Sequence, residues 1–189
     1  MTIAILLLLV AGAHIGEPPA PPPPSPWGHD AVRLALHALL ESPFPEAEQP
    51  TRSLRLVIVP PFPSRRIVVV RLTADPTAVE IVTKSLSNWF PKPGTPSIHP
   101  TRSLPSTFWT ELSTLLEAGF WRFHPAPFPN PNMADGSAWF LEAAGPRGYR
   151  SIIQHSPEQN AFRELCQGLL RASSLEFSPE EYSLWFGST

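Results

Sequence analysis

The chain has 189 residues, of which 42% are apolar and 10% aromatic, a composition that can form the core of one domain. Fourteen Lys and Arg residues against sixteen Asp and Glu give a formal net charge of −2, and no stretch is strongly basic. This balance argues against nucleic acid or an anionic membrane surface as a partner. With Cys166 as its single cysteine, the chain has no intrachain disulfide.

The first residues have the pattern of an export signal. Residues 1–10 are apolar and are followed by Ala11-Gly12-Ala13, a small-x-small site of the kind that signal peptidase cleaves. The apolar run is far below the roughly 20 residues of a membrane span. We therefore expect a signal peptide over residues 1–13, no membrane span, and a mature chain that begins near His14 in the periplasm or outside the cell.

The next segment, residues 14–28, contains a proline cluster between Pro18 and Pro26. Proline fixes the backbone angle φ and lacks the N–H donor that helices and sheets use, so this segment is predicted to be a polyproline II spacer. The remaining residues, 29–189, are predicted to form a single domain. Its first element is a helix over residues 29–41, which has a wide apolar face and ends before Pro43.

Strands dominate the next part of the chain. Turn-forming residues separate several β-branched runs, and the Asp75-Pro76-Thr77 turn precedes the last of these runs. The runs indicate an antiparallel meander over residues 54–59, 67–72 and 79–83. A further short strand is predicted near Ile98.

A second helix is expected to begin at Ser103 or Ser106, since either serine can cap a helix N-terminus. Gly119 stands where a glycine commonly follows the end of a helix. The spacing predicts a buried stripe that consists of Phe108, Leu112, Leu115 and Leu116.

A β-hairpin is predicted from residues 137–143 and 149–155, with residues 144–148 as its loop. In this register Trp139, Leu141 and Ile153 share one face. The facing pairs are then Ala143/Tyr149, Glu142/Arg150, Leu141/Ser151 and Trp139/Ile153.

A third helix is predicted to begin at Ser156, with Ser156 as N-cap, Pro157 in the first turn and Gln159 completing a capping box. Its buried stripe consists of Phe162, Leu165, Cys166, Leu169 and Leu170. These elements predict an α+β fold, in which an antiparallel sheet of the meander and the C-terminal hairpin carries the two main helices on one face.

Several motifs in residues 54–172 belong together: Arg55-Leu56, Val69-Val70-Arg71-Leu72, the stretches 115–121 and 135–142, Gly148-Tyr149, Ser156-Pro157 and the stretch 162–166. Together they resemble a group of uncharacterised exported bacterial proteins. The resemblance carries no activity with it. At Gln154-His155 the chain departs from the group, which tends to have a basic residue followed by an aromatic one.

Few residues suggest catalysis or metal binding. The six histidines lack the spacing of metal ligands, and Cys166 lies on an apolar stripe, so no metal site and no cofactor are predicted. His155, Ser156 and Asp135 are the residue types of a hydrolytic triad. Helix capping explains Ser156, however, and the chain has no nucleophile elbow.

The candidate ligand-binding residues are Trp121, Asp135, Trp139, Glu142, Tyr149, Arg150 and His155. Trp121, Trp139 and Tyr149 could form an aromatic platform for a sugar or peptide, but core packing is the simpler interpretation, and we predict that Trp139 is core. The sequence favours a non-catalytic exported domain that binds a protein or glycan of the bacterial cell envelope. The alternative is a small hydrolase that uses His155 with Asp135 or Glu142.

Overall fold

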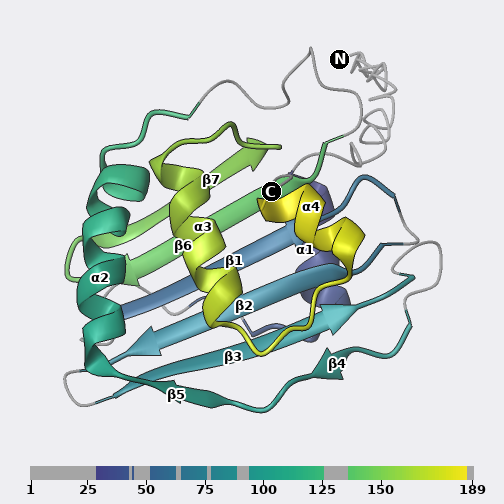
Figure 1. The fold of residues 1–189 in the computed structure, drawn as a ribbon, viewed down its shortest axis with the longest axis horizontal. Coiled ribbons are helices and arrows are strands. Elements are labelled where there is room, and N and C mark those ends of the chain that lie inside the picture. The colour runs from purple at the N-terminus through teal and green to yellow at the C-terminus, as the bar shows by residue number, and fades with distance from the viewer. Residues whose placement is uncertain are drawn as a thin grey trace, which may run out of the picture.

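The computed structural model describes residues 29–42, 44, 52–62, 65–75, 78–88, 94–125 and 136–186. The predicted export signal, the spacer and Asp135 lie outside these residues. Within them the domain has an α+β fold built on an antiparallel sheet, as the sequence predicted (Figure 1). The sheet order is β4-β3-β2-β1-β6-β7, and β5 also pairs with β3.

The meander and the hairpin are both present as strands of this sheet. The meander consists of β1 (Arg52–Val59), β2 (Ile67–Ala74) and β3 (Val79–Leu86). The short strands β4 (Ser97–Ile98) and β5 (Arg102–Leu104) follow it, so the strand predicted near Ile98 is confirmed. The hairpin consists of β6 (Ala138–Gly145) and β7 (Gly148–His155).

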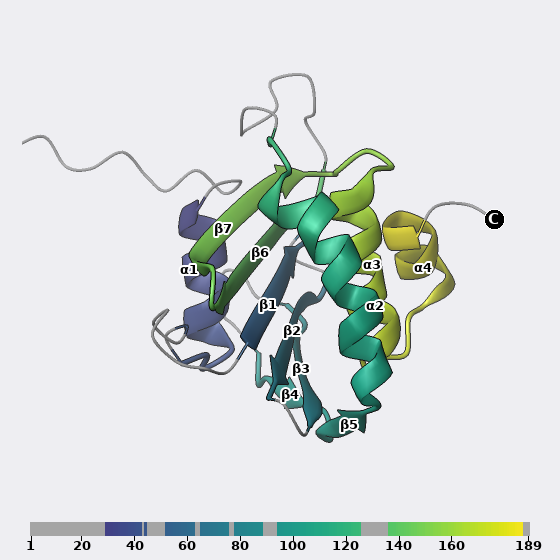
Figure 2. The same cartoon turned by 90° about the vertical axis from the view of Figure 1, so that its left-hand side faces the viewer.

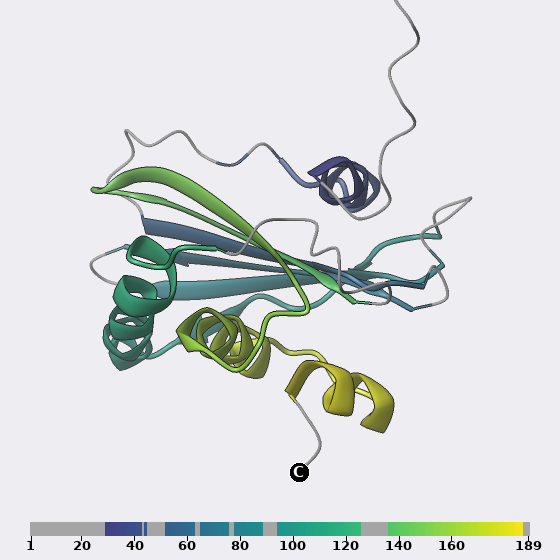
Figure 3. The same cartoon turned by 90° about the horizontal axis from the view of Figure 1, so that it is seen from above.

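Helices cover both faces of the sheet (Figures 2 and 3). One face carries α1 (His29–Ala38), which ends before the Leu39-Leu40 turn. The other face carries α2 (Ser106–Leu116), α3 (Ala161–Ala172) and α4 (Pro179–Phe186). This coverage explains why the central strands β1 and β6 are buried along nearly their whole length.

The sheet separates two hydrophobic cores. On the side of α2 and α3, the third helix contributes its predicted stripe of Phe162, Leu165, Cys166, Leu169 and Leu170, all buried. On the side of α1, the helix packs Ala31, Val32 and Ala35 against the alternate residues of the strands. Trp139 is only 2% exposed and belongs to the first core, which confirms the prediction that it is a core residue.

The predicted register of the hairpin is wrong by one residue. The turn contains only Pro146 and Arg147, and Gly148 follows with a φ of +90°, a conformation that glycine adopts without strain. Because the loop is shorter than predicted, every facing partner shifts by one position. The observed pairs include Ala144/Tyr149, Ala143/Arg150, Glu142/Ser151, Leu141/Ile152 and Phe140/Ile153.

The shift changes two predicted contacts. Ile153 lies in the core beneath α1, and Ile152 takes its predicted place beside Trp139 and Leu141. Glu142 faces Ser151 instead of Arg150, so these two charged side chains lie on opposite faces of the sheet and the predicted pairing is wrong.

The third helix begins later than predicted. Ser156 has a φ of +43°, whereas an N-cap residue is normally extended, and its backbone N–H donates to the carbonyl of Ser137 at 2.8 Å. The N-cap is Asn160, whose side-chain oxygen accepts a hydrogen bond from the backbone N–H of Arg163 at 3.0 Å. The prediction that Ser156 caps α3 is therefore wrong.

The second helix also differs from its predicted ends. Ser103 lies in β5 and Ser106 is the first helical residue, so neither serine caps α2, and Pro105 occupies the N-cap position without a side-chain hydrogen bond. The helix does not stop at Gly119 but runs directly into a π-helical turn, Glu117–Trp121. A Cβ atom at Gly119 would lie 2.2 Å from the carbonyl oxygen of Ala161, so this glycine allows the π turn and the start of α3 to touch.

Candidate functional site

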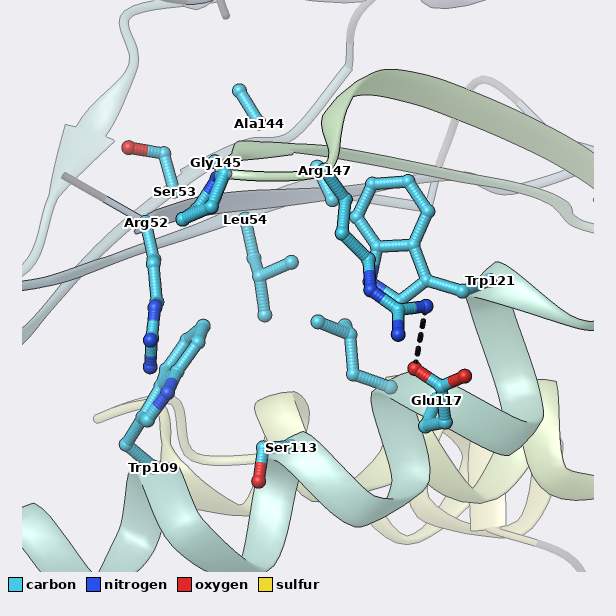
Figure 4. Close-up of a pocket in the computed structure, with 13 residues that line it drawn as sticks. Arg52, Ser53, Leu54, Trp109, Ser113, Glu117, Trp121, Ala144, Gly145 and Arg147 are labelled. Carbon is cyan, nitrogen blue, oxygen red and sulfur yellow. Dashed lines mark ion pairs between the residues drawn. The ribbon is translucent and has the colours of Figure 1, made fainter. Parts of the chain in front are cut away.

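A pocket of about 270 Å³ lies where the start of β1, the β6–β7 turn and α2 meet (Figure 4). Aromatic, aliphatic and charged side chains line it, together with the backbone of the turn. The lining residues are Arg52, Ser53, Leu54, Trp109, Ser113, Leu116, Glu117, Trp121, Ala143, Ala144, Gly145, Pro146 and Arg147.

The pocket has a tryptophan on each of two sides (Figure 4). On one side the guanidinium of Arg52 lies over the ring of Trp109, 5.6 Å from its centroid, at the distance of a cation–π contact. On the other side stand Trp121, Arg147 and Glu117. The aliphatic side chain of Leu54 lies between the two sides.

The geometry of α2 explains how its residues reach the pocket. Trp109, Ser113 and Glu117 are four residues apart, so they stack on one face of the helix. The π turn then widens the helix: the backbone N–H of Arg122 donates to the carbonyl of Glu117, five residues earlier, at 3.1 Å. Trp121 comes from this turn, and such π turns occur frequently at functional sites.

The charges around the pocket are unequally paired. Glu117 binds Arg147 at 2.7 Å and Arg122 at 3.0 Å, so two guanidinium groups share one carboxylate. Arg52 forms no ion pair with any carboxylate among the described residues. The indole Nε1 of Trp109 is buried and has no hydrogen-bond partner among the described residues.

A second group of polar residues lies on the opposite face of the sheet, at the end of α1. We call it the charge cluster, and it consists of Glu41, Arg55, Arg71, Lys84, Glu142 and Tyr149. The Glu41 side chain is 3% exposed, and its carboxylate lies 2.5 Å from Arg71, 2.8 Å from Lys84 and 3.5 Å from Arg55. Glu142 accepts hydrogen bonds from Arg55 and from the Tyr149 hydroxyl, the latter at 2.8 Å.

Strand register produces the charge cluster. Arg71, Arg55 and Glu142 lie opposite one another on β2, β1 and β6, so their side chains form a row on one face. Lys84 also donates to the carbonyls of Leu39 and Leu40 at 3.3 Å each. The cluster thereby fixes the end of α1 to the sheet, which is a structural role.

The phenol of Tyr149 in this cluster has a raised pKa. Desolvation raises the pKa of its phenol above the ordinary value, and the hydrogen bond to the Glu142 carboxylate raises it further. On the other face of the sheet, burial raises the pKa of the Cys166 thiol well above its usual range. A buried, protonated thiol is a poor nucleophile, so Cys166 is a core residue.

The structure separates the predicted site residues instead of gathering them. Trp121 lines the pocket, Trp139 lies in the core, and Glu142 and Tyr149 belong to the charge cluster. Arg150 donates to the backbone carbonyls of Trp121 and Phe123, and so fixes the chain after the π turn.

Of the two carboxylates that the hydrolase hypothesis gave His155, Glu142 lies far from it along the sheet. The Nε2 of His155 lies 2.9 Å from the carbonyl oxygen of Gly136, and the strand partner of His155 is Ala138. Glu142 is four residues further along β6, which is about 13 Å at about 3.3 Å per residue. The other proposed partner, Asp135, lies outside the described residues.

Sequence reasoning missed most of the pocket, above all Arg52, Trp109, Glu117 and Arg147. One signal was available: Ser113 and Glu117 follow Trp109 at intervals of four, so an aromatic, a hydroxyl and a carboxylate side chain share one face of the helix, at the edge of the stripe beside Leu116. The contribution of Arg52 carries no such local signal.

The described residues contain neither a cluster of metal-binding side chains nor a membrane-spanning helix. No group of three or more His, Cys, Asp or Glu side chains in this part of the chain is placed to hold a metal ion. No described helix combines the length and the apolar character needed to cross a membrane.

Comparisons with protein-family models, with curated protein sequences and with solved structures found no match to this chain.

Proposed function

We propose that this protein is a non-catalytic binding domain whose ligand occupies the pocket between Trp109 and Trp121. The observation that carries the proposal is the pair of tryptophans on two sides of one cavity, with the aliphatic side chain of Leu54 between them. Aromatic rings provide a large contact area at low entropic cost, which suits a binding surface.

The chemistry around the pocket supports binding over catalysis. Among the described lining residues the acidic side chain is Glu117, which Arg147 and Arg122 hold, so it is not a free general base. The hydroxyl side chains of the same lining are Ser53 and Ser113, and Ser113 donates to the carbonyl of Thr110 at 2.7 Å. His155 is not among the lining residues.

The proposal is tested by nuclear magnetic resonance with a library of small peptides, amino-acid derivatives and sugars. We expect the ligands that bind to shift the indole N–H signals of Trp109 and Trp121. The matched internal control is Trp185, which is 1% exposed in the core and should not respond. A Ser113→Phe variant fills the pocket while leaving both tryptophans in place, and it should abolish the shifts.

Three results would oppose this function. Ligands that shift only signals from the α1 face would place binding elsewhere, and a library without any effect on either indole would leave the pocket without a role. Binding that survives in Ser113→Phe would have the same consequence.

We also propose that the domain works outside the cytoplasm, at the cell envelope, with a protein or glycan partner. The support is the apolar run and the small-x-small site in residues 1–13, followed by a proline-rich spacer. Mass spectrometry of the protein from its native cells should find an N-terminus near His14. Recovery from the cytosol with Met1 retained would refute export.

A further inference from the structure

We propose that the ligand of the pocket is an apolar residue with a free carboxylate, such as the C-terminal residue of a peptide chain. This inference rests on the proposed function, in which the pocket is the binding site. Arg52 binds the carboxylate, and the apolar body lies between Trp109 and Trp121.

The charges of the lining decide the charge of the ligand. The charged side chains among the described lining residues are Arg52, Arg147 and Glu117, which sum to one positive charge. Arg147 and Arg122 already occupy Glu117, so Arg52 is the lining cation that pairs with no carboxylate of the described residues. A guanidinium presents a planar fork of donors that fits a carboxylate, and one positive charge matches a monoanion better than a doubly charged phosphate.

The indole of Trp109 offers a second donor on the same side of the pocket. The Nε1 of Trp109 is buried without a hydrogen-bond partner, and an unpaired buried donor costs about 1–3 kcal/mol. Arg52 lies over this same ring. A small rearrangement that brought a carboxylate oxygen to this side of the pocket would satisfy the guanidinium and the indole together.

The body of the ligand follows from the size and lining of the cavity. At about 270 Å³ the pocket is slightly below the roughly 300–1,000 Å³ of drug-sized sites, so it fits one large side chain. Leu54, Leu116 and Ala143 offer no hydrogen bonds. A sugar would leave several hydroxyl groups unpaired on such a surface, whereas an aromatic or branched apolar side chain would not.

The test compares two probes of the same shape and different charge. We expect N-acetyl-phenylalanine to bind at least about tenfold more tightly than its amide, with shifts of the Trp109 and Trp121 indole signals. Arg52→Gln should remove the preference for the acid. The matched control Arg33→Gln changes net charge equally at a side chain that is 78% exposed on α1, and it should keep the preference.

Further probes identify the source of the carboxylate. Tighter binding of Gly-Gly-Phe than of phenylacetate supports a peptide end as the natural ligand, and equal binding supports a small free acid with the same chemistry. Tighter binding of D-glucuronate than of N-acetyl-phenylalanine would overturn the apolar body.

The outcomes also separate this inference from the proposed function. If the acid and the amide bind equally at the two indoles, the carboxylate is wrong and the pocket remains a binding site. If neither probe and no library member affects these indoles, both proposals fail.

Discussion

The buried ion pair between Arg55 and Glu142 allows a quantitative test of the charge cluster. Both side chains are 4% exposed, and Glu142 has a second partner in the Tyr149 hydroxyl. Replacing Glu142 with Leu leaves the Arg55 guanidinium in the interior with two polar partners among the described residues, the Ser42 carbonyl at 2.7 Å and the Glu41 carboxylate at 3.5 Å. Breaking a buried pair in this way costs about 3–5 kcal/mol, and the two remaining partners place the cost near the lower end.

The double variant Arg55→Met/Glu142→Leu should be more stable than Glu142→Leu alone. It removes both buried charges, so neither is left unpaired, and Glu41 keeps Arg71 and Lys84 as partners. Replacing a whole buried pair with apolar residues is often close to neutral. We expect the free energy of unfolding of the double variant to lie within about 1 kcal/mol of wild type.

Urea denaturation at neutral pH measures these differences. With a slope of about 2 kcal/mol per M, the single variant should unfold at a urea concentration about 1.5 M below wild type, and the double variant should recover most of this shift. The control is Asp30→Leu with Arg33→Met, a pair with one side chain 78% and the other 48% exposed, whose coupling should stay below about 1 kcal/mol. If the double variant loses the sum of the two single losses, the pair is not coupled and our account of the cluster is wrong.

Three further predictions concern single residues. Trp139→Ala should lower the free energy of unfolding by about 3–5 kcal/mol, because the ring is buried in the core, and a denaturation midpoint equal to wild type would contradict this. Asn160→Ala should cost about 1 kcal/mol through loss of the N-cap of α3, and Ser156→Ala, measured beside it, should cost less. The pKa of the Tyr149 phenol is raised in the folded state, so above about pH 10 the phenol loses its proton more readily in the unfolded chain. The free energy of unfolding should therefore decline as the pH rises beyond about 10. Tyr149→Phe should weaken that decline in denaturation measured across this range.

The sheet could be predicted because its signals are local. The β-branched runs of β1, β2 and β3 are separated by turn residues, and β-branched residues are enriched in strands. The stripe on α3 is equally local, since its spacing alone determines which side faces the core.

The hairpin register and the start of α3 depended on features that short-range patterns do not contain. A change of one residue in the length of the loop shifts the register, and the turn-forming residues between β6 and β7 are compatible with the predicted loop as well as with the observed one. Ser156 has the right chemistry for a cap, but its backbone N–H donates to the carbonyl of Ser137, just before β6. This hydrogen bond holds Ser156 in a left-handed conformation. A tertiary contact thus overrode the capping preference of the sequence.

The pocket could not be predicted because three distant segments form it. Arg52 starts β1, Trp109 lies on α2, and Arg147 lies in the β6–β7 turn. Nothing near Arg52 in the sequence indicates that its guanidinium lies over the Trp109 ring. Only the packing of α2 across the sheet brings these side chains together.

The central position of β1 affects the order in which the chain can fold. Its pairing with β2 joins neighbouring segments and closes a short loop, whereas its pairing with β6 joins residues as distant as Ile58 and Trp139. During synthesis the meander is complete long before β6 has been made. Until then the edge of β1 that later pairs with β6 has no hydrogen-bonded neighbour, although β1 is a very apolar strand. A chain cut after residue 125 would keep that edge open permanently and would associate with other copies through it.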